Sequence, residues 1–489
     1  MSFEPVLATT SGGELCGRSS DGVREFLGVP YAAAPVGALR WAPPAPPPAW
    51  GGTLEATEAA PPAPQPDRPL GHRSHGELPP SSEDCLRLNI YAPKAREGAA
   101  LPVFVWLHGG GWVLGSPSAP IFDGASLARA LDAVVVMVTY RLGSLGWLHN
   151  SALAAAPGEP AGNWGLLDQI AALRWTRANA AAFGGDPDRI VLAGESAGAA
   201  SVIHLLGAPS AAGLVQRAIA MSPPLGESTI SVELAQRWSE ALAATLGARL
   251  GDESLREIDA ADVIAAHERL ITEEPFRGTR GGSLPTLDGG EIPADPVAVP
   301  GVQPQIDVLV GTNADEATFF YRQPDRVVEP DDDTLAAMVA RLPGVGCAAE
   351  SAIRARRAAG SLENNEILVA IATDAVFAGP VERWAAARSL AGGRVHRYRL
   401  EHRSPQPGLG AVHTIGVPLL FATHRSSIPG AWVAGDDERA DQVSDAVRAA
   451  WRGFVHDGDP GWAPIAVGDG EDELGVFGGA GDGLRVTTA

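Results

Sequence analysis

Short, mostly apolar segments recur along the chain, and segments with helical spacing separate them. The predicted strands are 101–107, 133–139, 189–193, 216–221, 306–311 and 394–400. The segments 101–107 and 133–139 are continuous apolar runs, as expected of strands that helices cover on both faces. Helical spacing covers 171–183, 199–206, 230–275, 334–358 and 364–390. Alternating strands and helices predict an α/β fold, with a mostly parallel central sheet and helices on both faces.

Two other segments have different patterns. Residues 5–30 alternate between apolar and polar positions, as the strands of hairpins do. Residues 42–82 are rich in proline, and we interpret them as an irregular surface loop that can lie over the mouth of an active site. No change in composition separates independent cores among the 489 residues, of which 45% are hydrophobic. We therefore expect a single domain, 1–489, with long inserted loops.

The segment 194–198, Gly-Glu-Ser-Ala-Gly, lies between a predicted strand and a predicted helix. A serine in a sharp strand-to-helix turn is held exposed in a strained conformation, and the flanking glycines avoid collisions with neighbouring backbone. The pattern G-x-S-x-G also arises by chance in ordinary tight turns. Its place between strand and helix favours Ser196 as a nucleophile.

A serine nucleophile needs a base, a carboxylate that orients the base, and donors for the developing oxyanion. The segment 108–112, His-Gly-Gly-Gly-Trp, follows the strand 101–107, and its glycines let bare N–H groups converge. We predict that the N–H groups of Gly110 and Gly111, with that of Ala197, form an oxyanion hole.

The candidate acid and base both follow predicted strands. The segment 311–319 carries Asp315 and Glu316, and spacing does not choose between these two carboxylates. Among 11 histidines, His413 lies in a loop after the last strand candidate, where this architecture requires the base.

The charge balance narrows the range of partners. The chain has 37 Lys and Arg against 58 Asp and Glu, a net charge of −21, which disfavours nucleic acid and anionic membranes as partners. Cys16, Cys85 and Cys347 are too widely spaced for a disulfide framework or a metal cluster. The N-terminus lacks a secretory signal, and no segment is long and apolar enough for a membrane span, so we expect a cytoplasmic protein.

Further motifs run through nearly the whole chain. They are 28–31, 83–89, 108–112, 140–143, 162–169, 183–187, 285–289 and 451–454. With these motifs the chain resembles the type-B carboxylesterases, the cholinesterase-like and para-nitrobenzyl esterase branch of the α/β-hydrolases. The resemblance implies Glu316 as the acid and His413 as the base. It also implies that Glu195 supports the site without joining the triad, whereas position alone equally fits an acid near a helix start.

The chain departs from the family pattern at three positions near the predicted acid and base. Ala317 and Thr414 stand where the family usually has glycine, and Gly416 stands where it usually has glutamate. We expect the missing glutamate to change how the histidine loop is held and to affect substrate preference. The segments 222–224 and 410–413 resemble those of bacterial esterases and phenmedipham-type carbamate hydrolases.

The resemblance implies a serine hydrolase that cleaves small-molecule carboxylic esters through an acyl-enzyme, with no metal or cofactor. A carbamate or amide hydrolase would use the same triad, and sequence does not separate these reactions. Non-catalytic binding modules share the fold but typically lack a complete triad. Trp112, Leu225, Phe319 and Phe320 are predicted to line the substrate pocket, although each also fits ordinary core packing. The acyl chain length, the alcohol and the oligomeric state are not fixed by the sequence.

Overall fold

The computed structural model describes residues 4–68, 75–154, 156, 158–273, 276, 284–300, 302–323, 326–360, 362–466, 472–479 and 483–488, apart from 95–99. Part of the proline-rich segment, 69–74, and the end of the predicted helical region 230–275 lie outside the described residues.

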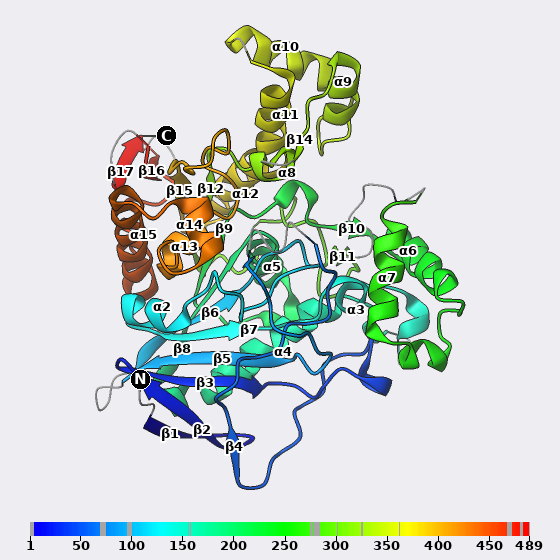
Figure 1. Ribbon diagram of the computed structural model, residues 1–489, viewed down its shortest axis with the longest axis vertical. Coiled ribbons are helices and arrows are strands. Elements are labelled where there is room, and N and C mark those ends of the chain that lie inside the picture. Colours follow the sequence, from blue (N-terminus) through cyan, green and yellow to red (C-terminus); the bar gives the residue numbers. More distant parts are fainter. Residues whose placement is uncertain are drawn as a thin grey trace.

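A single large sheet organises the molecule (Figure 1). In the described residues it has 13 strands in the order β1-β2-β3-β5-β7-β6-β8-β9-β12-β15-β16-β17, and β4 pairs with β2. Their bounds are β1 (Glu4–Thr10), β2 (Gly13–Ser20), β3 (Val23–Pro30), β4 (Thr53–Glu55), β5 (Arg87–Pro93), β6 (Leu101–Leu107), β7 (Val134–Val138), β8 (Gly185–Glu195), β9 (Arg217–Met221), β12 (Asp307–Asn313), β15 (Val395–Leu400), β16 (Glu473–Phe477) and β17 (Leu484–Thr488). Two short pairs stand apart, β10 (Ile230–Ser231) with β11 (Thr286–Leu287), and β13 (Arg322–Gln323) with β14 (Arg326–Val327).

The centre of the sheet is parallel and its margins are antiparallel. The strands from β7 through β6, β8, β9, β12 and β15 to β16 pair in parallel. The alternating segment 5–30 forms the antiparallel strands β1 to β3, as predicted. Because parallel strands end at the same edge, the loops after β6, β8, β12 and β15 meet there.

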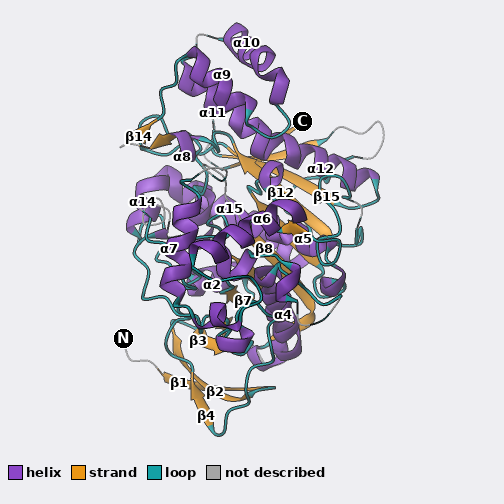
Figure 2. Cartoon of the chain, turned by 90° about the vertical axis from the view of Figure 1, so that its right-hand side faces the viewer, coloured by secondary structure: helices purple, strands orange, loops and turns teal. Residues whose placement is uncertain are grey.

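Helices cover both faces of the sheet (Figure 2). The α-helices of the described residues are α2 (Gly124–Leu131), α3 (Gly143–Trp147), α4 (Trp164–Asn179), α5 (Ala197–Gly207), α6 (Val232–Thr245), α7 (Ala260–Leu270), α8 (Thr318–Tyr321), α9 (Asp332–Ala340), α10 (Ala349–Ala359), α11 (Asn364–Ala372), α12 (Gly379–Leu390), α13 (Gly416–Phe421), α14 (Ile428–Ala434) and α15 (Glu438–Asp457). A π-helical turn, Thr373–Ala378, joins α11 to α12. The predicted helix 334–358 is divided into α9 and α10, because Pro343 and Gly344 interrupt it.

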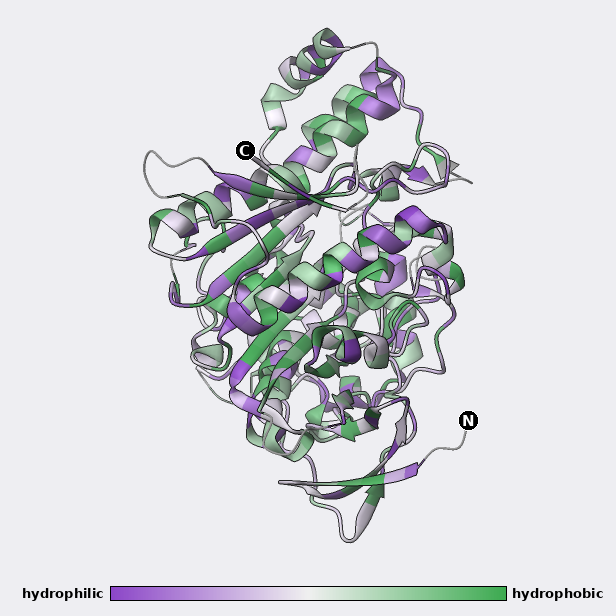
Figure 3. Cartoon of the chain, turned by 90° about the vertical axis from the view of Figure 1, so that its left-hand side faces the viewer, coloured by the Kyte–Doolittle hydropathy of each residue, from purple (hydrophilic) through white to green (hydrophobic). Residues whose placement is uncertain are grey.

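The alternation of side chains along each strand separates two cores. Val103 and Val105 of β6 pack in one cluster with residues of α4, α5 and α12. Phe104 and Trp106 point to the other face and pack in a second cluster with residues of α2, α13 and α15. Both faces are therefore apolar, which explains the continuous hydrophobic runs of the sequence and the hydrophobic central strands of Figure 3.

Two helical regions project beyond these layers (Figure 1). Helices α9, α10 and α11 share their own apolar cluster, which includes Leu335, Val339 and Ile367. Helices α6 and α7 pack around the buried Trp238. No helix in the described part of the chain combines the length and the apolar character that a membrane crossing requires.

Candidate active site

Ser196 lies in the turn between β8 and α5, with φ 55° and ψ −123°. The glycines on either side make this turn possible. A Cβ on Gly194 would lie 2.5 Å from the carbonyl carbon of Gly198, and one on Gly198 would lie 2.1 Å from the oxygen of Leu107. The sequence therefore produces a strained strand-to-helix turn that displays the serine hydroxyl, as the motif predicts.

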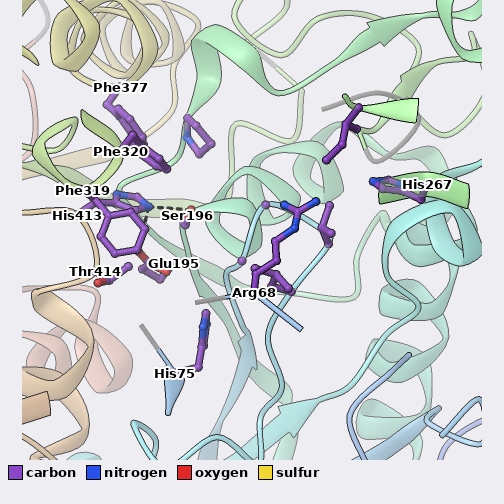
Figure 4. Close-up of a pocket in the computed structure, with 16 residues that line it drawn as sticks. Arg68, His75, Glu195, Ser196, His267, Phe319, Phe320, Phe377, His413 and Thr414 are labelled. Carbon is purple, nitrogen blue, oxygen red and sulfur yellow. Dashed lines mark hydrogen bonds and ion pairs between the residues drawn. The ribbon is translucent and has the colours of Figure 1, made fainter. Parts of the chain in front are cut away.

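His413 joins Ser196 to Glu316 (Figure 4). Its Nε2 lies 2.8 Å from the Ser196 Oγ, and its Nδ1 lies 2.7 Å from the Glu316 Oε2. Glu316 is fully buried, and its second oxygen accepts a hydrogen bond of 2.7 Å from the Asn313 N–H. A carboxylate only accepts, so the ring proton resides on Nδ1 and the lone pair of Nε2 faces the serine hydroxyl.

Asp315, the other carboxylate of this loop, contacts the backbone of the histidine loop instead. Its side chain accepts a bond of 2.8 Å from the Ala411 N–H, and its own N–H donates to the Ala411 oxygen at 3.0 Å. The Asn313 amide donates to the Val412 oxygen at 2.9 Å, and the Thr318 hydroxyl donates to the Leu409 oxygen at 2.7 Å. The loop after β12 thus holds the backbone that carries His413.

The three departures from the family pattern have distinct structural settings. A Cβ on Gly416 would meet the apolar Met221 and Leu400 side chains at 3.2 and 3.4 Å, so this position lies in an apolar contact. Ala317 has φ −76° and needs no glycine. Thr414 has φ 72°, a left-handed conformation that costs a β-branched residue about 1–3 kcal/mol.

The three predicted oxyanion donors are backbone N–H groups near Ser196 in the sequence or in the cavity lining. In the described part of the chain, the N–H groups of Gly110, Gly111 and Ala197 donate no hydrogen bond to another residue. Gly110 has φ 112°, and a Cβ there would lie 2.1 Å from the Leu114 oxygen. The conformation of the loop therefore depends on glycine.

Neighbouring groups hold the glycine loop in place. The Tyr140 hydroxyl donates to the His108 oxygen at 2.7 Å, and its ring stacks on the His108 ring. Burial lowers the pKa of His108 to about 3, so this ring is neutral and donates from Nδ1 to the Gly109 oxygen. Gln65, from the proline-rich segment, bonds both the N–H and the oxygen of Gly115.

Glu195 is a buried carboxyl directly beside the catalytic candidates. Its Oε1 lies 3.4 Å from the His413 Nε2. Burial raises its pKa to about 7, and the nearby Glu316 contributes in the same direction while His413 opposes the shift. Near neutral pH the carboxyl therefore exists in both protonation states.

A cavity of about 240 Å³ opens next to Ser196. Its lining residues are Arg68, His75, Gly110, Gly111, Val113, Leu114, Glu195, Ser196, Pro224, His267, Ile271, Phe319, Phe320, Phe377, His413 and Thr414. The ring centroids of Phe319, Phe320 and Phe377 lie 5.8, 5.6 and 4.9 Å from the centroid of the His413 ring. One wall of the cavity is therefore aromatic.

The structure corrects two of the four predicted pocket residues. Phe319 and Phe320 line the cavity, whereas Trp112 and Leu225 do not. Trp112 is fully buried, and its indole N–H donates to the Ser201 hydroxyl at 2.9 Å. Leu225 is buried in the core on the α5 side of the sheet. Both side chains therefore pack in the core, which was the alternative that the sequence left open.

Sequence reasoning missed Phe377, Arg68, His75 and His267 as cavity residues. Phe377 comes from the π-helical turn, and an irregular helix gives no periodic signal. Arg68 and His75 come from the proline-rich segment, and the interpretation of that segment as a loop over the site was the only signal available.

A mostly parallel sheet whose strand ends carry a serine elbow, a carboxylate and a histidine defines an α/β-hydrolase. The chain belongs to the carboxylesterase family, whose model matches residues 4–467.

Individual relatives agree with this assignment. The chain is 36% identical to the para-nitrobenzyl esterase of Bacillus subtilis (strain 168) over 458 residues, 93% of this chain and 90% of that protein. It is 35% identical to the phenmedipham hydrolase of Pseudarthrobacter oxydans over 461 residues, 93% and 90% of the two chains. A solved PNB esterase structure superposes with a TM-score of 0.85 at 31% identity and covers 99% of this chain and 97% of its own. The protein is therefore an enzyme that hydrolyses esters.

Proposed function

We propose that the enzyme cleaves carboxylic esters through an acyl-enzyme on Ser196, with His413 as the general base and Glu316 as its orienting acid. The observation that carries this proposal is the pair of contacts from one imidazole, 2.8 Å to the serine oxygen and 2.7 Å to the buried carboxylate. Such an arrangement makes an otherwise weak hydroxyl nucleophilic.

The first half of the reaction follows from these contacts. The Ser196 Oγ attacks the acyl carbon while its proton moves to the His413 Nε2. The N–H groups of Gly110, Gly111 and Ala197 receive the negative charge on the former carbonyl oxygen. His413 then gives its proton to the departing alkoxide oxygen as the carbon–oxygen bond breaks, and the alcohol leaves.

Water completes the cycle by the same route. His413 takes a proton from water, the hydroxide adds to the acyl carbon, and the Ser196 oxygen leaves and recovers the proton. The products are a carboxylic acid and the free enzyme. Glu195 supports this cycle as a buried charge near the imidazole, since its ionised form stabilises the cation that forms in each half.

The mechanism is tested with Ser196→Ala. We expect p-nitrophenyl ester hydrolysis to fall by about 10⁴-fold or more, with an unchanged thermal unfolding curve. Unchanged turnover would remove the mechanism. Covalent labelling by an organophosphate, with its mass located on Ser196, separates the enzyme from a binding module that merely shares the fold.

Carbamates are a second candidate substrate class, supported by the similarity to a phenmedipham hydrolase. A carbamate carbonyl needs the same nucleophile and donors as an ester carbonyl. Comparison of kcat/KM for matched ester and carbamate pairs decides between the two, and a preference of the ester by more than about 10³-fold would reject the carbamate candidate.

Two broader predictions accompany this function. A single catalytic domain is supported by one sheet that contains strands from Glu4 to Thr488. A cytoplasmic location is supported by Cys16, Cys85 and Cys347, which are all unpaired. Limited proteolysis tests the single domain, and cell fractionation tests the cytoplasmic location.

A further inference from the structure

The predicted oxyanion hole takes its donors from two separate segments of the chain. Gly110 and Gly111 belong to the loop after β6, whereas Ala197 is the first residue of α5. The loop and the elbow approach each other closely at one end, where a Cβ on Gly109 would lie 3.1 Å from the Ser196 Cβ. Three N–H groups bind one oxygen atom only if their relative positions are fixed to within about 0.5 Å. A contact that ties the rest of the loop to α5 therefore bears on the reaction.

Trp112 follows the two donors of the loop in a turn that is unusual for an aromatic residue. The Gly110 oxygen accepts a hydrogen bond of 3.2 Å from the Val113 N–H. The two residues between them, Gly111 and Trp112, have φ values of 65° and 59°. Two successive positive φ values are typical of a type I′ turn, in which Gly, Asn and Asp dominate and bulky residues are rare. Contacts of the Trp112 side chain must therefore hold the turn in this conformation.

The Trp112 side chain is anchored on α5. It is fully buried, and its indole N–H donates to the Ser201 Oγ at 2.9 Å. Ser201 lies four residues after Ala197, so the two lie one turn apart on the same face of α5. The Ser201 oxygen also accepts a bond of 3.2 Å from the Gln169 Nε2 of α4, which fixes the acceptor from a second helix. The loop that carries two donors is thus bonded to the helix that carries the third.

We propose that Trp112 and Ser201 are positioning residues for the oxyanion hole. Their hydrogen bond fixes the glycine loop relative to α5, so that the three N–H groups face one oxygen atom. Both side chains are fully buried and neither lines the cavity, so they act through the backbone donors and not on the substrate. The inference rests on the acyl-enzyme reaction proposed for Ser196.

Trp147 provides a matched control in the same core. It is fully buried in the same apolar cluster, and its ring centroid lies 5.9 Å from that of Trp112. Within the described residues the Trp147 indole N–H has no hydrogen-bond partner. Trp147→Phe therefore removes the same atoms as Trp112→Phe, but it breaks no bond to α5.

The first test compares the kinetics of these variants on one p-nitrophenyl ester. Trp112→Phe and Ser201→Ala should each lower kcat by about 10- to 100-fold with little change in KM, because the displaced donors act on charge that forms only in the transition state. Trp147→Phe should keep kcat within about twofold of the wild type, although its thermal stability should also fall. The double variant Trp112→Phe/Ser201→Ala should be no more than about twofold slower than the slower single variant, because both changes break the same bond.

A transition-state analogue separates positioning from a general loss of packing. In a trifluoromethyl ketone the Ser196 Oγ adds to the carbonyl carbon, the serine proton moves to the His413 Nε2, and the carbonyl oxygen becomes an oxyanion in the hole. Its inhibition constant should rise in Trp112→Phe and Ser201→Ala by the same factor by which kcat/KM falls. The matching methyl ketone binds without forming the anion, so its inhibition constant should stay within about twofold in every variant.

The outcomes separate this role from core packing and from the reaction itself. The inference is overturned if Trp112→Phe and Ser201→Ala lower thermal stability but match Trp147→Phe in kcat and in the trifluoromethyl ketone constant. Fully additive losses in the double variant would also overturn it, since the two residues would then act independently. If the wild type binds the two ketones equally, or if Ser196→Ala keeps full turnover, the acyl-enzyme reaction fails and the positioning role fails with it.

Discussion

The cavity combines two groups of residues that come from different kinds of segment. The proposed reacting groups form the reacting side, and the residues that shape the space for the substrate form the substrate side. These names refer to role and not to position, since Phe377 of the substrate side lies beside His413. Ser196, Glu316 and His413 lie in loops that directly follow β8, β12 and β15 of the sheet. Phe377, Arg68 and His267 come from a π-helical turn, a proline-rich segment and a helix that projects from the layers. The sheet thus positions the reacting groups, while insertions shape the space that receives the substrate. Substitutions on the reacting side should change kcat, and those on the substrate side should change selectivity.

Among the variants that test this comparison, Glu316→Gln should cause the largest loss of activity. The amide can present its NH₂ group to the Nδ1–H and disfavour the reactive tautomer, so kcat should fall by about 10³- to 10⁴-fold with little change in KM. Steady-state kinetics on one p-nitrophenyl ester measure this effect. A loss of less than about tenfold would mean that the carboxylate does not orient the base.

Asp315 tests whether the loop contact matters for the reaction. Asp315→Ala removes the acceptor for the Ala411 N–H, so His413 should lose alignment and kcat should fall by about 10- to 100-fold. Gly410→Ala should reproduce the defect, because a Cβ there would lie 2.2 Å from the Asp315 Oδ2.

Two controls accompany this pair of variants. Asp315→Asn keeps an acceptor oxygen and should restore much of kcat. Arg403→Ala removes only an exposed charge 3.7 Å from Asp315 and should behave as the wild type. A fall in thermal stability with unchanged kcat in Asp315→Ala would make its role structural only.

Glu195 should make the free energy of unfolding depend on pH. Its folded pKa of about 7 exceeds the ordinary value of 4.5, so the folded state binds the extra proton between these pH values. Stability is therefore lost as pH rises from about 4.5 to about 7, by on the order of 1–3 kcal/mol. Glu195→Gln should lack this loss, so its free energy of unfolding relative to the wild type should rise across this pH range. Denaturant unfolding at several pH values measures the difference, and parallel pH profiles would contradict the assignment.

The smallest effect is expected from the aromatic wall. Phe377→Ala removes a ring 4.9 Å from that of His413, so kcat/KM for aromatic or long-chain esters should fall by about tenfold relative to acetate esters. Competition between two esters in one reaction measures the ratio directly. If all esters slow equally, Phe377 acts on the position of His413 and the division between the two sides fails at this residue.

The reacting side was largely predictable because its signals are local. Gly194 and Gly198 are required by close backbone contacts, and the apolar runs before each loop mark buried strands. The choice of Glu316 over Asp315 was not local, since both follow the same strand. It depends on which carboxylate faces His413, 97 residues further along the chain.

The substrate side was less predictable because most of its residues come together through contacts between distant parts of the sequence. Phe319 and Phe320 follow the acid and were identified as cavity residues. Trp112 was misplaced because an aromatic residue beside a glycine loop can turn either way, and here the bond to Ser201 holds it in the core. Arg68 bonds to Glu268, 200 residues further along the chain, and no motif links it to the neighbouring His267, so only packing shows that Arg68 and His267 share a cavity.

The loop after β12 positions the backbone before His413 through hydrogen bonds, and these bonds affect which sequence changes the enzyme can accept during evolution. Asn313, Asp315 and Thr318 bond to main-chain atoms of 409–412, which every amino acid other than proline supplies in full. Mutations at 409, 411 and 412 that keep the side-chain volume should leave the base aligned, whereas position 410 must remain glycine. Drift or laboratory evolution could thus explore new side chains around His413, including unusual ones such as Thr414, without rebuilding the catalytic core.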